Sequence, residues 1–115
     1  MLPYFTVKEQ SMEPLIREGD FVLVNRMSYL FLRPKIGHIV VVRHPKRPSM
    51  LLLKRIVQEK KGMYWVEGDN ASKSTDSRHF GWLKSGFVVG KVIHKTSPLD
   101  LGIMRKSFVR EHIMS

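Results

Sequence analysis

The chain has 115 residues, of which 43% are apolar, which is enough for one domain with one hydrophobic core. It contains no cysteine, which excludes disulfides and thiolate zinc sites. Its 20 lysines and arginines outnumber its 10 aspartates and glutamates, so the formal net charge is +10. The basic residues are spread along the chain without an aromatic-basic module, so we interpret them as a solvated surface and expect no nucleic-acid partner.

The sequence gives no sign of a membrane-spanning or secretory segment. No apolar run approaches the roughly 20 residues that cross a bilayer. The N-terminus lacks the basic region, apolar core and small-residue cleavage site of a signal peptide. We therefore expect a soluble, cytoplasmic protein, or one that is at most peripheral at a membrane surface.

The tetrapeptide Ser11-Met12-Glu13-Pro14 follows a short apolar stretch over residues 4–7. Proline suits the first turn of a helix and glycine commonly ends one, so we expect a short helix over residues 14–18 that stops at Gly19. Ser11 then lies where a strand gives way to a tight turn, with backbone N–H groups free to face a developing negative charge. From this stretch alone, Ser11 is either a helix cap or a nucleophile that needs a base.

Five further segments are predicted to be short β-strands, because they are rich in apolar, often β-branched residues and turn formers lie between them. They are residues 21–24, 39–43, 50–58, 63–67 and 87–94. Lys60-Lys61-Gly62 predicts a hairpin turn, and Gly90 predicts a bulge or a close backbone approach. This pattern predicts an all-β fold of mainly antiparallel short strands, as a sheet or a partly open barrel, with short helical turns.

Two apolar segments lie outside these strands. Residues 27–32 are expected to be partly loop, as either an exposed patch or a flap folded onto the core. A C-terminal helix is predicted from the spacing of Leu101, Met104, Phe108 and Ile113. We therefore expect a main domain over residues 1–97 and a helical tail over residues 98–115 that packs on the same domain.

Lys54 lies among large apolar residues of the predicted strand 50–58. In an extended chain its side chain shares one face with Met50, Leu52 and Ile56. Burial penalises the charged ammonium and lowers its pKa from the ordinary value of about 10.4, which would make Lys54 a usable general base. The alternative is a lysine whose stem covers apolar surface while its ammonium reaches water. Arg55 faces the other way and is expected to form a structural ion pair.

Residues 68–78 are dense in small hydrogen-bonding side chains, which hold a loop rigid by bonding nearby backbone groups. Within this loop, Asp76 and Arg78 can pair, and Ser74 can hydrogen-bond the Lys54 amine. The acidic spacing of an EF-hand and the glycines of a phosphate cradle are both absent, so we expect no metal and no cofactor. The loop either supports a lysine set in apolar surroundings or is purely structural.

Together these stretches closely resemble the type I signal peptidase family, whose members are serine peptidases with a Ser-Lys dyad. The resemblance covers residues 5–92 in the family's order and includes the complete motif Gly-Asp-Asn-x-x-x-Ser-x-Asp-Ser-Arg over residues 68–78. The other matching stretches are Ser11-Met12-Glu13-Pro14, Gly19-Asp20, residues 34–45, Lys54-Arg55, Phe80-Gly81 and Val89-Gly90-Lys91. The resemblance implies an all-β peptidase core.

It also implies a role for each site residue. Ser11 would be the nucleophile, its backbone N–H an oxyanion donor, and Lys54 the general base. Met12 would contact the substrate. The site-supporting residues would be Ser74, which orients Lys54, with Asp76, Arg78 and Asn70. The implied chemistry uses no metal and no cofactor.

Two features depart from the family pattern. Glu9 and Gln10 stand where members often carry serine or glycine, which affects the second oxyanion donor or the substrate groove. We also expect the chain to lack the N-terminal membrane anchor of ordinary signal peptidases. Residues 42–48 and 65–70 are similar to one branch, the maturation proteases of nickel-type superoxide dismutase, which trim an N-terminal extension from a precursor.

The implied function is a serine endopeptidase that removes an N-terminal leader from a protein precursor, nickel-type superoxide dismutase being the candidate substrate. Three alternatives stay open at this point. They are general signal-peptidase-like processing of exported preproteins, a self-cleaving peptidase of the repressor type, and a non-enzymatic basic binding module. The oligomeric state is not encoded in any pattern of the sequence.

Overall fold

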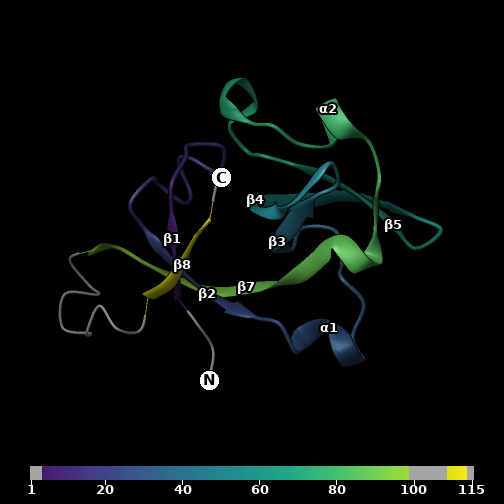
Figure 1. Cartoon of the computed structure of the whole chain (residues 1–115), viewed down its shortest axis with the longest axis horizontal. Coiled ribbons are helices and arrows are strands. Elements are labelled where there is room, and N and C mark those ends of the chain that lie inside the picture. Colours follow the sequence, from purple (N-terminus) through teal and green to yellow (C-terminus); the bar gives the residue numbers. More distant parts are fainter. Residues whose placement is uncertain (1–3, 99–108, 114–115) are drawn as a thin grey trace.

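The computed structural model describes residues 4–98 and 109–113, which fold as one β-sheet with short helical segments (Figure 1). The strands are β1 (Tyr4–Val7), β2 (Phe21–Asn25), β3 (Ile39–His44), β4 (Arg47–Lys60), β5 (Met63–Glu67), β6 (Leu83–Lys84), β7 (Val88–Thr96) and β8 (Val109–Ile113). The helical segments are α1 (Ser28–Phe31), α2 (Ser77–Phe80) and the 3-10 turns η1 (Ala71–Lys73) and η2 (Ser85–Phe87). The predicted all-β class is confirmed.

The strands form an open sheet in the order β6-β5-β4-β3-β7-β2-β1-β8. Among the described strands, every neighbouring pair is antiparallel except β1 with β8, which is parallel. In Figure 1 the long strand β7 joins two halves, with β1, β2 and β8 in one half and β3, β4 and β5 in the other. The turn after β1 and the loop after β5 reach the same end of the molecule, and both carry predicted site residues.

Strand β4 contributes to both parts of the hydrophobic core, because successive side chains of a strand point to opposite faces. Leu53 belongs to a first cluster, and Leu52 and Ile56 belong to a second. The first cluster contains Phe5, Val7, Met12, Ile16, Val22, Val24, Val41 and Leu53. The second contains Val40, Val42, Leu52, Ile56, Tyr64, Val66 and Leu83. Lys54 lies between Leu52 and Ile56 along the strand, so β4 directs an ionisable side chain into a largely apolar setting.

Two local predictions around glycine are confirmed. The turn between β4 and β5 uses Lys61 at φ 52° and Gly62 at φ 77°, and tight hairpin turns need these left-handed values. A Cβ atom on Gly90 would lie 2.9 Å from the carbonyl oxygen of Asn25 and 2.9 Å from Val24 Cγ1. Gly90 therefore allows β7 to approach β2 closely, and the pairing register shifts nearby.

Three segments differ from the predictions. Residues 14–18 form turns rather than a helix, because Met12 and Ile16 both pack into the first core cluster and a single bond from Ile16 N–H to Met12 O at 3.0 Å closes the turn. Ser28–Phe31 forms the helix α1 within a segment expected to be partly loop. Val109–Ile113 is a strand paired with β1, where a helix was predicted. The rest of that predicted helix, including Leu101, Met104 and Phe108, lies outside the described residues.

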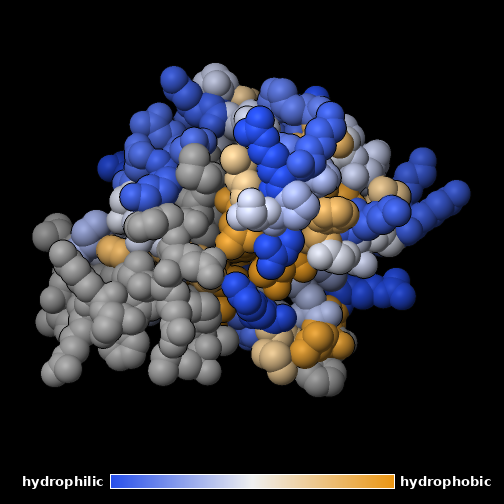
Figure 2. Space-filling model, viewed as in Figure 1, coloured by the Kyte–Doolittle hydropathy of each residue, from blue (hydrophilic) through white to orange (hydrophobic). Residues whose placement is uncertain are grey.

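The apolar side chains around α1 form an exposed patch rather than a flap over the core. Met27 is 57% exposed, Leu30 65% and Leu32 68%. Figure 2 shows hydrophobic surface over α1 beside strongly hydrophilic side chains. Within residues 4–98 and 109–113, no helix has the length and apolar content needed to cross a membrane.

Candidate active site

Ser11 lies in the turn that joins β1 to β2, and this turn is held from both sides. At its base, Val7 N–H donates to Asp20 O at 2.9 Å and Gly19 N–H donates to Val7 O at 2.8 Å. Met12 and Ile16 anchor it from inside, since both are buried in the first core cluster. The side chain of Met12 is fully buried and supports the turn, and its expected contact with a substrate stays a prediction.

Lys54 extends from β4 between two serine hydroxyl groups. Its Nζ atom lies 2.8 Å from Ser11 Oγ and 3.1 Å from Ser74 Oγ. Lys54 is 1% exposed and Ser11 is 0% exposed, so the alternative of a lysine that reaches water does not apply. The structure therefore brings together three side chains that are far apart in the sequence, in a setting from which water is largely excluded.

The surroundings of Lys54 lower its pKa to about 8. The largest cause is burial, which penalises the charged ammonium. The negative charges of Asp76 and Glu9 act in the opposite direction, and the positive charge of Arg78 adds to the lowering. Near pH 8 a substantial fraction of Lys54 is therefore neutral and has a lone pair available to accept a proton.

Asp76 is fully buried, and both of its carboxylate oxygens accept hydrogen bonds. Its Oδ2 atom accepts from Ser74 Oγ at 2.5 Å, from Gly68 N–H at 2.8 Å and from Arg78 Nη2 at 2.6 Å. Its Oδ1 atom accepts from the backbone N–H and the Nε atom of Arg78 at 3.1 and 3.0 Å. Burial by itself would raise the pKa of Asp76, but these hydrogen bonds outweigh it and hold the pKa well below its usual range, so Asp76 stays anionic at neutral pH.

The loop over residues 68–78 docks on the Ser11 turn through its backbone. Asn70 N–H donates to Ser11 O at 2.7 Å, and Asn70 Nδ2 donates to Gln10 O at 3.1 Å. Gly68 lies at the closest approach, because a Cβ atom there would be 2.4 Å from Ser74 Oγ and 2.7 Å from Ser11 O. Residue 68 must therefore be glycine if Ser11, Ser74 and the loop backbone are to keep these positions.

Several supporting contacts were not predicted individually. Ser77 Oγ accepts from Val66 N–H at 2.8 Å and ties α2 to β5. Gly68 and Ser77 both belong to the motif over residues 68–78, so the motif itself was the signal that could have identified them. The ion pair expected of Arg55 is present, with Nε and Nη2 each 2.9 Å from a carboxylate oxygen of Asp69.

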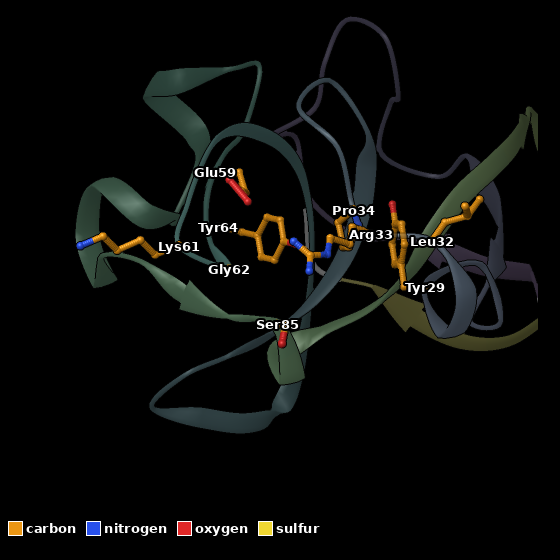
Figure 3. A pocket seen from close by; sticks show the side chains of 9 residues that line it. All are labelled: Tyr29, Leu32, Arg33, Pro34, Glu59, Lys61, Gly62, Tyr64 and Ser85. Atoms are coloured by element: carbon orange, nitrogen blue, oxygen red, sulfur yellow. The ribbon is translucent and has the colours of Figure 1, made fainter.

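Two cavities formed by the described residues lie outside this cluster. One of about 550 Å³ lies between α1 and the β4–β5 turn, and Figure 3 shows Arg33 reaching toward Tyr64 within it. Its lining residues are Tyr29, Leu32, Arg33, Pro34, Glu59, Lys61, Gly62, Tyr64 and Ser85. A smaller cavity of about 180 Å³ borders the segment just before Ser11, and its lining residues are Lys8, Glu9, Gln10, Glu18 and Lys73. Neither is lined by Ser11 or Lys54, so the candidate active site is the hydrogen-bonded cluster itself.

Comparison with known proteins identifies the family of the chain. The family model described as signal peptidase, peptidase S26, matches residues 1–58 and 57–96. Mitochondrial inner membrane protease subunit 1 of Mus musculus is 30% identical to the chain, covering 84% of the chain and 71% of the relative. Signal peptidase I of Aquifex aeolicus is 40% identical, covering 46% of the chain and 21% of the relative.

The comparisons also correct the expected location. A cytoplasmic protein, or one peripheral at a membrane surface, was expected because the sequence has no long apolar run. Similar curated proteins include mitochondrial inner membrane protease subunits from Mus musculus, Homo sapiens and Arabidopsis thaliana. The expectation was therefore wrong, because it inferred a location from the apolar content of this one sequence.

Proposed function

Because the chain belongs to the signal peptidase family, peptidase S26, we propose that it is a serine endopeptidase that uses a Ser11–Lys54 dyad to remove an N-terminal leader from a protein precursor. One observation carries the dyad assignment. The Nζ atom of a buried lysine lies 2.8 Å from the hydroxyl of a buried serine. A serine hydroxyl becomes a good nucleophile only when a base takes its proton, and this distance is suitable for that transfer.

Asp76 sets the direction of the hydrogen bonds around the lysine. An anionic carboxylate can only accept hydrogen bonds, so the hydroxyl of Ser74 donates to Asp76. The oxygen of Ser74 is then left to accept from Lys54 Nζ, 3.1 Å away. A neutral amine that donates to Ser74 can direct its lone pair at the hydroxyl proton of Ser11. This arrangement supports Ser74 as a positioning residue and Lys54 as the base.

The proposed reaction proceeds in two stages. Neutral Lys54 accepts the proton of Ser11 Oγ as that oxygen attacks the carbonyl carbon of the scissile peptide, and the resulting ammonium donates the proton to the departing amine. Lys54 then accepts a proton from a water molecule whose oxygen attacks the acyl carbon. The bond between that carbon and Ser11 Oγ breaks, the Lys54 ammonium returns the proton to Ser11 Oγ, and the leader is released. The backbone N–H of Ser11 is proposed as one donor to the oxyanion; Glu9 and Gln10 leave the second donor unassigned.

The proposed substrate is a folded or folding protein that carries an extended leader at its N-terminus. The resemblance of residues 42–48 and 65–70 to one branch makes the precursor of nickel-type superoxide dismutase the first candidate. Exported preproteins are the second, because Aquifex aeolicus signal peptidase I is among the relatives. Cleavage of the chain itself during incubation would indicate the self-cleaving alternative, and salt-dependent DNA binding without proteolysis would indicate a binding module.

The first experiment mixes the purified protein with the nickel superoxide dismutase precursor and with a panel of leader peptides, and reads product masses. The expected result is one discrete N-terminal cleavage of at least one substrate. Ser11→Ala and Lys54→Arg should each lower kcat/KM by a factor of about 1,000 or more. The first variant lacks the nucleophile, and in the second arginine cannot release its proton at neutral pH. Ser72→Ala and Lys60→Arg are the matched controls, since both side chains are exposed and lie in the same loop and the same strand.

Appreciable turnover by Lys54→Arg would rule out Lys54 as the base. If the parent protein cleaves leader peptides but not the superoxide dismutase precursor, the peptidase assignment stands and that substrate is excluded. If every substrate stays intact at a pH well above 8, the peptidase proposal itself fails.

A further inference from the structure

The C-terminal strand β8 is the one strand that departs from the antiparallel pattern among the described strands. It pairs in parallel with β1, with Tyr4 opposite Val109 and Val7 opposite Ile113. It also contacts β4, the strand that carries Lys54. In Figure 1 this strand overlaps β1, in the half of the sheet formed by β1, β2 and β8. The strand therefore contacts both β4, which carries Lys54, and β1, which leads into the Ser11 turn.

The edge that β8 covers leads to the nucleophile. Strand β1 ends at Val7, and the turn that follows it carries Ser11. An extended peptide gains affinity by adding a strand to a free sheet edge, where unpaired N–H and C=O groups are available. In the part of the chain that the structure describes, the sheet ends at β6 and at β8, so without β8 the free edge would be β1.

The other sheet edge is an unsuitable place for a substrate. Strand β6 pairs with β5 at Met63 and Tyr64, and Met63 lies opposite Lys60 of β4. Lys60 is about 20 Å along an extended strand from Lys54, at roughly 3.3 Å per residue. A peptide on β6 would therefore leave its scissile bond far from Ser11, whereas a peptide on β1 would end near it.

The direction of β8 also matches that of a leader. A leader to be removed has its scissile bond at its C-terminal end, so that end must point toward Ser11. Strand β8 runs from Val109 beside Tyr4 to Ile113 beside Val7, which is the direction in which β1 approaches the Ser11 turn. The chain thus holds a segment of its own in the orientation that a leader would need on this edge.

We propose that β8 is an autoinhibitory strand, which occupies the leader-binding edge of β1 and must leave before a substrate can bind. The proposal rests on the proposed peptidase function and adds a means of regulation to it. It agrees with the burial of both dyad residues, since Ser11 is 0% and Lys54 1% exposed while β8 is in place. Any partner that captured residues 109–113 would activate the enzyme.

The size of the effect follows from the fraction of molecules in which the edge is free. The apparent dissociation constant of a leader equals the intrinsic constant divided by that fraction. If β8 is docked in about nine molecules out of ten, releasing it lowers the dissociation constant about 10-fold. Release should change binding and KM, with much less effect on kcat, because β8 contributes no reacting group to the proposed chemistry.

The experiment keeps the full chain and compares two double variants. Glu111→Pro with His112→Pro removes two backbone N–H groups, and since adjacent residues of a strand present them to opposite sides, one of the two faces β1. Glu111→Ala with His112→Ala changes the same side chains and keeps both N–H groups. In a Ser11→Ala background, each protein binds a fluorescent leader peptide, and the dissociation constant is measured without cleavage.

We expect the proline variant to bind the leader about 10-fold more tightly than the parent, and the alanine variant to match the parent. Val7 N–H donates to Asp20 O, so Val7 and, by alternation, Phe5 present their amides to the β2 side, and Thr6 presents its amide to β8. Hydrogen exchange of the Thr6 amide should become faster in the proline variant alone. Unchanged exchange would show that β8 does not cover the edge. Equal dissociation constants in all three proteins would show that covering the edge is not inhibitory, and absent binding even in the proline variant would show that the edge does not bind a leader. Each of these results overturns the autoinhibition.

A failure of the peptidase proposal gives a different result. If the proline variant with Ser11 intact binds a leader tightly and never cleaves it, β8 covers a leader-binding edge of β1 as proposed, but the proposed peptidase reaction is wrong. Cleavage with a KM that does not differ between the proline and alanine variants would instead retain the peptidase and refute the autoinhibitory strand.

Discussion

Lys54 experiences opposing electrostatic influences, and one of them comes from an exposed residue that can be altered without disturbing the core. Burial lowers the pKa of Lys54 to about 8, while the carboxylates of Asp76 and Glu9 raise it. Asp76 is also the hydrogen-bond partner of Ser74, so its replacement would change several contacts at once. Glu9 is exposed and lies just before the nucleophile, which makes it the better probe of the proposed base.

The first prediction concerns the pH dependence of kcat/KM. Because Lys54 acts as a base only when neutral, activity should rise through an apparent pKa of about 8 and level off above it. Glu9→Gln removes a negative charge that stabilises the ammonium, so the rise should move to lower pH. The shift should shrink with added salt, which screens charges at exposed positions.

Glu18→Gln is the matched control for this prediction. Glu18 lines the same small cavity as Glu9, but it is not among the groups that shift the pKa of Lys54. Its substitution should leave the midpoint of the profile where the parent has it. A flat profile between pH 6 and pH 10 in the parent would contradict the assignment of Lys54 as the base.

The second prediction tests Ser74 as a positioning residue. Ser74→Ala removes the acceptor that holds Lys54 Nζ at 3.1 Å and leaves Asp76 without one donor. We expect kcat to fall by about 10- to 100-fold with little change in KM, because substrate binding does not use this hydroxyl. Ser72→Ala, an exposed serine in the same loop, should have parental kinetics.

A purely structural role for Ser74 would change stability and leave the form of the pH profile intact. If Lys54 loses its orienting partner, the profile of Ser74→Ala should change its midpoint as well as its height. Ser74→Thr keeps a hydroxyl group and should recover part of the lost kcat. Loss of activity in Ser74→Ala with an unmoved midpoint, and no recovery in Ser74→Thr, would count against positioning.

At the scale of the elements, the backbone of the loop after β5 packs directly against the backbone of the Ser11 turn. The third prediction is that Gly68→Ala disrupts this contact, since its Cβ atom would lie 2.7 Å from the carbonyl oxygen of Ser11 and 2.4 Å from Ser74 Oγ. One of the two segments must move, and displacement of catalytic groups by about 1 Å typically costs about 100-fold in rate. Both kcat and the midpoint of thermal unfolding should fall.

Gly86 provides the comparison within the same chain. No atom lies within 4 Å of a Cβ built on Gly86, so Gly86→Ala should leave kcat and the unfolding midpoint nearly unchanged. Parental kinetics in Gly68→Ala would mean that the loop and the turn can separate without consequence, which would contradict the proposed site geometry.

The sequence predicted the elements whose signals are local. β-Branched runs bounded by turn formers identified the strands that became β2, β3, β4, β5 and β7, and the placement of Lys54 among apolar side chains of β4 followed from strand periodicity. The pattern around residues 101–113 predicted a helix, but apolar spacing in a short segment also fits a strand. Val109–Ile113 is a strand because it pairs with β1. Pairing with a segment that is distant in the sequence cannot be predicted from the local residue pattern.

For the site, too, local motifs were predictable from the sequence and contacts between distant segments were not. Ser11, Lys54, Ser74, Asp76, Arg78 and Asn70 were named from motifs, and the structure brings all six into one hydrogen-bonded group. What the motifs could not supply are distances that depend on how three separate segments pack. The approach of Gly68 to Ser11 and the burial of Met12 are of this kind, since each depends on neighbours from another part of the chain.

At the scale of the whole molecule, the fold buries the ionisable amine of Lys54 next to its hydrophobic core. Lys54 is among the largest side chains that are fully buried, and the apolar clusters on both faces of β4 surround its strand. Removing an ammonium from water is costly even when polar partners are present. The proposed catalytic base should therefore lower the stability of the whole protein, as is common for residues kept for function.

The fourth prediction is that Lys54→Met abolishes activity and stabilises the fold at neutral pH. Methionine has a similar volume and no charge, so we expect the free energy of unfolding to rise by about 1–2 kcal/mol, measured with urea at pH 6.5. The pKa of Lys54 is about 8 in the folded protein and about 10.4 in the unfolded chain, so the unfolded chain binds more protons between these values. The stability of the parent should therefore increase from pH 8 to pH 10.4, and the advantage of methionine should shrink over the same interval. Lys60→Met, at an exposed position of the same strand, is the control and should change the free energy of unfolding by less than about 0.5 kcal/mol at every pH. An equal gain in both variants would mean that the buried charge of Lys54 does not limit stability.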